Sequence, residues 1–153
     1  MKPPSYHFIT HWKIRGPIGV VYGILKDGPR YADWWRPAYV RSEAAGPNKV
    51  RSLVRAKLPY TLEFITEGVK EDPPHSFTLR STGELAGTGV WSLCQEGTWT
   101  SVEFVWDVST EKKWIRRLTP LLRPFFSWNH NWVMKQGGTR LQEEVNRHVL
   151  RHR

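Results

Sequence analysis

The segment 124–138, PFFSWNHNWVMKQGG, sets an Asn-His-Asn cluster among aromatic and aliphatic side chains. At about 100° per residue in a helix, His130 falls near the middle of an otherwise apolar face. The other members of that face are Phe126, Val133, Met134, Gly137, Leu141 and Val145. A histidine there is either a core residue bonded to a neighbouring polar group or a polar group facing a cavity. In a cavity, a neutral imidazole donates from one nitrogen and accepts at the other, so it would bind a hydroxyl or a carbonyl.

The other histidines and the single cysteine do not suggest a metal site. His7 and His11 would lie about 13 Å apart on one strand face, too far to share an ion. His148 and His152 have helical spacing but no carboxylate or cysteine near them in the sequence. Cys94 is more often an apolar filler than a nucleophile. We therefore expect no metal and no cofactor.

Two pairs of carboxylates are spaced to share a strand face: Glu63 with Glu67, and Glu103 with Asp107. Apolar residues alternate with them, so the carboxylates are expected to face solvent. A bulge that reversed one strand would instead bring a carboxylate, above all Glu63, into the interior.

Strong catalytic motifs are absent from the sequence. It contains no G-x-S-x-G elbow, no phosphate-binding P-loop and no H-E-x-x-H helix. Gly87 and Gly89 open a strand, whereas a dinucleotide site needs a helix after its glycines, so both are predicted to be turn residues. No catalytic residue can be named, and an enzymatic role is the less favoured interpretation.

Length and composition indicate one globular domain over residues 1–153. Nine tryptophans and 13% aromatic residues mean that a core or a pocket must be built largely from rings. No apolar run approaches the ~20 residues that span a bilayer, and the first residues lack the apolar stretch of a signal peptide. With one cysteine and no internal disulfide, a cytoplasmic location is expected.

A net charge of +9 raises nucleic acid or an anionic surface as partners. The charge is spread along the chain, and its densest parts, EKKWIRRL and NRHVLRHR, suit solvated helix surfaces. Nucleic acid is therefore an unfavoured partner, while transient contact with an anionic surface stays open.

Strand patterns bounded by turn residues dominate the first two thirds of the chain. The expected strands cover 6–15, 39–45, 49–58, 60–71, 76–82, 87–96 and 99–110. Pro17 begins a helix to about Lys26, and RYADWWRPAY gives a short helical turn that ends before Pro37. Sequential strands favour hairpin pairing, and seven antiparallel strands tend to curl under their own twist.

The periodicity becomes helical from Lys112 onward. Pro120 and Pro124 are expected to separate a short segment, 112–118, from a long helix between about Pro124 and about Leu150. The order of elements predicts an α+β fold in which a curved seven-stranded antiparallel sheet surrounds a long C-terminal helix, with two short helices after the first strand. A cavity remains if the sheet does not close fully on the helix.

Several segments in this order carry a resemblance to a known family: YADWWRPAY, LPYTLEF, GTGVWSL, VEFVWDV and FFSWNHNWVM. The chain, from residue 6 to about residue 150, resembles the START-like or SRPBCC superfamily, and within it the polyketide cyclase/dehydrase and lipid-transport branch. The resemblance implies a helix-grip fold whose cavity binds lipids, sterols, polyketides or other apolar molecules. Only some members are enzymes, so the resemblance implies the fold more strongly than the function.

The resemblance favours a ring-lined pocket over a filled core. The residues expected to line it are His130, Asn129, Tyr60, Trp34, Phe64, Trp91, Phe104, Trp106, Phe126, Val133 and Met134. Three functions remain open. The first is binding or transport of a small hydrophobic ligand. The second is an aromatase/cyclase-like enzyme in which His130 or a carboxylate moves protons. The third is a basic nucleic-acid or anionic-surface binder.

Overall fold

The computed structural model describes residues 5–55, 61–110 and 119–151. The elements are β1 (Ser5–Arg15), α1 (Ile18–Lys26), the 3-10 turn η1 (Gly28–Arg30), α2 (Tyr31–Trp34), β2 (Tyr39–Gly46), β3 (Lys49–Arg55), β4 (Thr61–Asp72), β5 (Ser76–Gly83), β6 (Leu85–Glu96), β7 (Trp99–Thr110) and α4 (Thr119–Arg151). Seven strands, short helices after the first strand and one long C-terminal helix were all predicted, and these predictions are confirmed.

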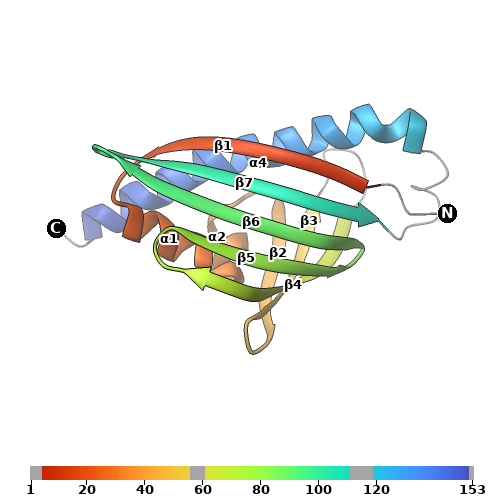
Figure 1. Ribbon diagram of the computed structural model, residues 1–153, viewed down its shortest axis with the longest axis horizontal. Coiled ribbons are helices and arrows are strands. Elements are labelled where there is room, and N and C mark those ends of the chain that lie inside the picture. The colour runs from red at the N-terminus through yellow and green to blue at the C-terminus, as the bar shows by residue number, and fades with distance from the viewer. Residues whose placement is uncertain (1–4, 56–60, 111–118, 152–153) are drawn as a thin grey trace.

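The strands form one antiparallel sheet in the order β1-β7-β6-β5-β4-β3-β2. Figure 1 shows this sheet curving along α4, with α1 and α2 beside the C-terminal half of the helix. In β7 the even-numbered residues from Thr100 to Thr110 are buried, while Glu103 and Asp107 point to the outer face. The predicted alternation in this strand is therefore confirmed, and its buried side forms the concave wall that faces the helix.

The start of α4 differs from the prediction. The helix begins at Thr119 and continues through Pro124 to Arg151, so the predicted start at about Pro124 is wrong and the predicted end at about Leu150 is confirmed. The first turn of a helix has no intrahelical partner for its N–H groups, so Pro120 removes nothing there, and the exposed Pro124 removes a single hydrogen bond. The predicted segment 112–118 lies outside the described residues.

Two glycines of α4 allow indole rings to lie directly on the helix. A Cβ atom on Gly137 would lie 2.5 Å from the Trp35 ring, and one on Gly138 would lie 3.1 Å from the Trp12 ring. The Trp35 indole also donates a hydrogen bond from Nε1 to the Val133 carbonyl oxygen, at 2.9 Å. The glycine pair therefore lets two indole rings approach the helix backbone closely.

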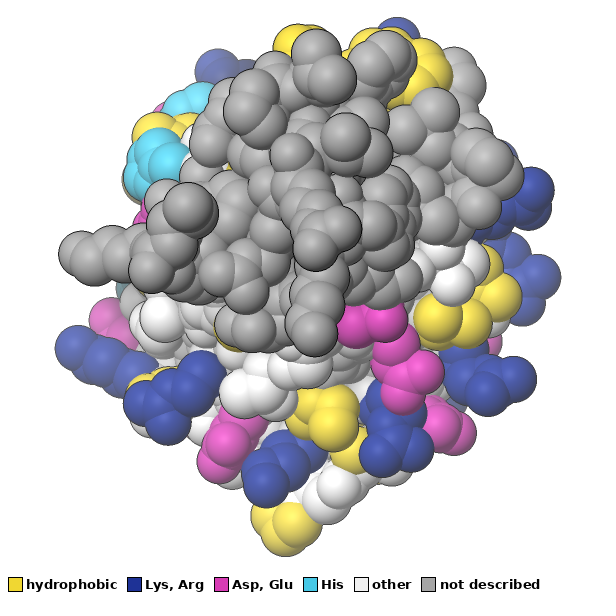
Figure 2. Space-filling view, turned by 90° about the vertical axis from the view of Figure 1, so that its right-hand side faces the viewer, with side chains coloured by type: hydrophobic (Ala, Val, Ile, Leu, Met, Phe, Trp, Pro, Cys, Tyr) yellow, Lys and Arg dark blue, Asp and Glu magenta, His cyan; other side chains and the backbone are white. Residues whose placement is uncertain are grey.

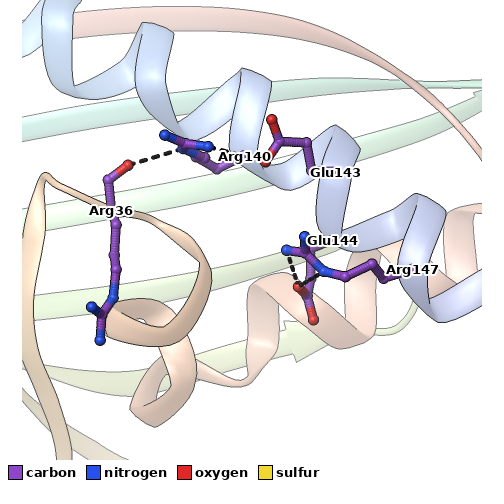
Figure 3. Close-up of polar contacts among 5 residues, drawn as sticks. All are labelled: Arg36, Arg140, Glu143, Glu144 and Arg147. Atoms are coloured by element: carbon purple, nitrogen blue, oxygen red, sulfur yellow. Dashed lines mark hydrogen bonds and ion pairs between the residues drawn. The ribbon is translucent and has the colours of Figure 1, made fainter.

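Polar contacts on the outer side of α4 fix the same region. Arg140 donates from Nε to the carbonyl oxygen of Arg36 at 3.2 Å, and its guanidinium lies 3.2 Å from Glu143 (Figure 3). Glu144 and Arg147 form a further pair within the helix, at 2.8 Å. Because Arg36 follows Trp35 in the chain, this contact lies next to the point where the indole packs on the helix.

Gly87 and Gly89 lie inside β6 rather than in a turn, so that prediction is wrong. Gly89 pairs with Trp106 of β7, and a Cβ atom on Gly89 would lie 2.8 Å from the Trp106 ring and 3.0 Å from the Phe104 ring. Because Gly89 has no side chain, the rings of Phe104 and Trp106, which belong to β7, have space to lie over β6 at this position. Gly89 therefore helps to shape the concave face.

Candidate functional site: an aromatic cavity

A cavity of about 410 Å³ lies between the concave face of the sheet and the helices. All seven strands contribute residues to its wall, as do α1, η1, α2 and α4. Its volume falls within the range of about 300 to 1,000 Å³ that is typical of pockets for small ligands.

A row of aromatic rings forms one wall of the cavity. Trp91 stacks on Phe104 with ring centroids 4.1 Å apart, and Phe104 stacks on Trp106 at 5.5 Å. Phe64 of β4 extends this row with a centroid distance of 6.1 Å to Trp106. Rings packed in this way offer a flat apolar surface on which another ring system can stack.

Most of the predicted site residues border this cavity. They are Phe64, Trp91, Phe104, Trp106, Asn129, His130, Val133 and Met134. Trp34 is buried but does not border the cavity. It stacks on Trp35 with ring centroids 5.3 Å apart, and Trp35 is the residue that borders the cavity. Tyr60 lies outside the described residues. Phe126 lies in α4, but its side chain is not among those described.

His130 borders the cavity, and one of its ring nitrogens has no partner among the described residues. Its imidazole stacks on the Phe8 ring, with centroids 3.9 Å apart and planes 14° from parallel. Its Nε2 is buried and makes no hydrogen bond to any described residue. Burial lowers the pKa of His130 to about 4, so the ring is neutral near pH 7. The sequence leaves two interpretations of this histidine open, a core residue with a bonded partner and a group facing a cavity, and the unpaired Nε2 is the observation that bears on them.

The burial of His130 predicts a specific loss of stability in mild acid. The pKa in the folded protein, about 4, lies below the ordinary value of 6.5, so the unfolded state takes up the proton first as the pH falls. The resulting contribution to the free energy of unfolding is fully present above about pH 6.5 and is lost as the pH falls toward about 4. Between about pH 7.5 and about pH 5, the loss due to His130 is expected to be about 2 kcal/mol.

Urea unfolding at a series of pH values, with wild type and His130→Leu compared, measures this loss. The difference in unfolding free energy between the two proteins is expected to change with pH by that amount. Parallel pH profiles for the two proteins would contradict the assignment.

The paired carboxylates stay outside the cavity, as predicted. On the outer face, Asp107 contacts His7, Glu103 lies 3.7 Å from His11, and Glu63 lies 3.7 Å from Arg51. Within the part of the chain that the structure describes, no cluster of three or more His, Cys, Asp or Glu side chains could hold a metal ion. In the same residues, no helix has the length and apolar character to cross a membrane.

Two tyrosines near the cavity were missed by sequence reasoning. Tyr31 and Tyr39 both border it, and their rings pack on Trp35 at centroid distances of 5.5 and 4.9 Å. The segment YADWWRPAY was noticed, but α2 is a single turn, so its periodicity cannot show which aromatic side chains point inward.

Comparison with known proteins gives matches in structure but none in sequence. No family model and no curated protein sequence matches the chain. The Zhui aromatase/cyclase from a Streptomyces species superposes with a TM-score of 0.74 at 15% identity, over 95% of this chain and 96% of that chain. A START superfamily protein from Mycobacterium smegmatis gives 0.75 at 13% identity, over 92% and 97%. A conserved protein from Geobacillus kaustophilus gives 0.76 at 14% identity, over 93% and 96%.

These matches extend over nearly the whole of both chains, so they compare the full arrangement of sheet and helix. Identities of 13 to 15% show a common fold and leave the ligand undetermined. The protein has a START-like (SRPBCC) helix-grip fold, and solved structures that share it include an aromatase/cyclase.

Proposed function

We propose that the protein binds a small apolar or aromatic molecule in this cavity, and that His130 hydrogen-bonds an oxygen of that molecule. The observation that carries the proposal is the Nε2 atom of His130, which is buried beside the cavity without a partner among the described residues. Buried polar atoms are nearly always hydrogen-bonded, so an unpaired one in a cavity wall indicates a place for a ligand atom. The structural neighbours support an apolar ligand, because they include a START superfamily protein and an aromatase/cyclase.

The wall of the cavity and His130 would select different parts of such a ligand. The rings of Trp91, Phe104 and Trp106 favour apolar surface, at roughly 25 cal/mol per Å² removed from water. A ligand oxygen that entered this wall unpaired would lose its hydration without replacement. A hydrogen bond with neutral His130 would replace the lost hydration, because the imidazole can accept from a hydroxyl or donate to a carbonyl.

Replacing His130 with leucine separates the two roles of this residue. Leucine has similar bulk and no polar atom, so the fold is expected to persist and naphthalene is expected to bind as well as before, or better. Affinity for naphthol is expected to fall by about 1 to 3 kcal/mol, the cost of leaving the naphthol oxygen unpaired. Quenching of tryptophan fluorescence during titration with each compound gives the two affinities, because Trp35, Trp91 and Trp106 border the cavity.

The matched control is His11→Leu, since His11 is exposed on the outer face of β1. It is expected to leave both affinities unchanged. A large fall in the melting temperature of His130→Leu with an unchanged preference for naphthol over naphthalene would show that His130 is a structural core residue and would refute the proposal.

A proton-transfer enzyme is the second candidate. It is supported by the aromatase/cyclase among the structural neighbours and by the neutral imidazole at the cavity wall. Exchange of the α-hydrogens of a bound ketone such as tetralone with deuterated water would distinguish an enzyme from a carrier. Exchange faster with wild type than with His130→Leu favours the enzyme, and equal exchange favours the carrier.

A nucleic-acid or anionic-surface binder has less support. On the face shown in Figure 2, Lys and Arg side chains are interspersed with Asp and Glu side chains. Several cations also have acidic partners on separate elements, including Lys13 with Glu96 and Lys26 with Glu71. A steep loss of binding to nucleic acid with added salt would be the sign of this function.

A further inference from the structure

Tyr39 carries a second polar group at the cavity wall that has no partner among the described residues. It is the first residue of β2, and its backbone N–H donates to the carbonyl oxygen of Trp35 at 2.8 Å. Its ring is held edge-on against Tyr31 at 5.3 Å and tilted against Trp35 at 4.9 Å. Its side chain borders the cavity, and its hydroxyl makes no hydrogen bond to any described residue.

The neighbouring Tyr31 shows what a structural tyrosine looks like at this place. Its hydroxyl donates to the carbonyl oxygen of Leu25 and is therefore satisfied inside the protein. Both phenols are neutral, because burial raises the pKa of each well above its ordinary value. Tyr39 thus keeps a neutral O–H that can donate and accept, whereas the Tyr31 hydroxyl already donates to Leu25.

Tyr39 and His130 reach the cavity from different sides. Tyr39 belongs to β2, one edge strand of the sheet, whereas His130 stacks on Phe8 of β1, the other edge strand. Trp35 lies between them, packed on Tyr39 and hydrogen-bonded to Val133, which follows His130 by about one helical turn. The stacked rings of β6 and β7, with Phe64 of β4, lie on strands between these two edges.

We propose that Tyr39 is a second specificity-determining anchor, so that the preferred ligand is an apolar ring system with two oxygen functions, one for the Tyr39 hydroxyl and one for His130. This inference rests on the proposed function and names its ligand class. A simple aliphatic chain with one polar end would satisfy only one anchor. A hydroxylated or keto-substituted ring system holds two oxygens at a fixed separation, and it can stack on the aromatic wall between them.

Affinities of naphthalene, naphthol and a set of naphthalenediol isomers test the inference, with wild type, Tyr39→Phe and Tyr31→Phe compared. In wild type, at least one diol is expected to bind about threefold to tenfold more tightly than naphthol, the effect of one additional neutral hydrogen bond. Tyr39→Phe keeps the ring and removes the hydroxyl, so it is expected to abolish this preference without lowering the melting temperature. The preference for naphthol over naphthalene, which depends on His130, is expected to remain.

Tyr31→Phe is the matched control. It removes the bond to Leu25, so it is expected to lower the melting temperature and to keep the preference for the diol. The inference is overturned if no diol binds more tightly than naphthol in wild type, or if Tyr39→Phe keeps the preference; in either case naphthol binding would leave the proposed function standing. If none of the compounds binds, both fail together.

Discussion

Replacing Thr66 with tryptophan is expected to lower the affinity for naphthol by roughly 100-fold or more, about 2.7 kcal/mol. Thr66 lies within β4 and borders the cavity, between Val50 of β3 and Ser81 of β5 in the sheet. The side chain of a strand residue stands roughly perpendicular to the sheet, so the indole would enter the space that the ligand needs. The fold should survive, because the indole enters a cavity rather than a filled core.

The control is Ile65→Trp, one residue earlier on the same strand. Ile65 does not appear in the cavity wall, and its cross-strand neighbours Arg51 and Thr82 are exposed on the outer face. This variant is expected to bind naphthol as wild type does. Tryptophan fluorescence gives the affinities and thermal unfolding checks the fold. Undiminished binding by a folded Thr66→Trp variant would place the ligand elsewhere.

Replacing Gly137 with valine is expected to lower the free energy of unfolding by about 3 kcal/mol. Even a Cβ atom at this position would lie 2.5 Å from the Trp35 ring, and the two methyl groups of valine add to the overlap. Trp35 cannot move away easily, because it is fully buried and packs on Trp34, Tyr31 and Tyr39. Valine has a better helix propensity than glycine, so the loss would come from the clash alone.

Gly19 in α1 provides the comparison, since a Cβ atom there would meet nothing within 4 Å. Gly19→Val is expected to change the unfolding free energy by less than about 0.5 kcal/mol. Chemical denaturation of both variants measures the difference. Equal stabilities for the two variants would show that α4 does not rest on Trp35 as the structure has it.

The order of the elements and the face of α4 could be predicted because both depend on periodicity. Alternation in β7 identified its buried side, and the spacing of Val133, Leu141 and Val145 identified the buried face of the helix. The start of the helix could not be predicted, because Pro120 and Pro124 look like breakers in a sequence. Both prolines lie near the N-terminus of α4, where few intrahelical hydrogen bonds depend on their missing N–H groups.

The candidate site could be predicted in part, and for a related reason. Rings that alternate with solvent-facing carboxylates were assigned to the correct side, as Phe64, Phe104 and Trp106 show. Trp35 and Tyr39 were missed, because the turn between α2 and β2 has no period from which a direction can be read. The role of Gly89 was missed as well. The rings that lie over Gly89 belong to β7, and only the register between β6 and β7 shows that they lie there.

A hydrogen bond between a ligand oxygen and His130 inside the cavity is central to the proposed function. Nitrogen-15 NMR spectra of the histidine side chains, recorded during titration with naphthol, test it most directly. The chain has six histidines, and His7 and His11 on the outer face serve as internal references. At saturation, the Nε2 signal of His130 is expected to shift by hydrogen bonding, with a smaller shift on titration with naphthalene, while the signals of His7 and His11 stay in place. Saturable binding of naphthol that leaves the His130 signal unmoved would contradict the account.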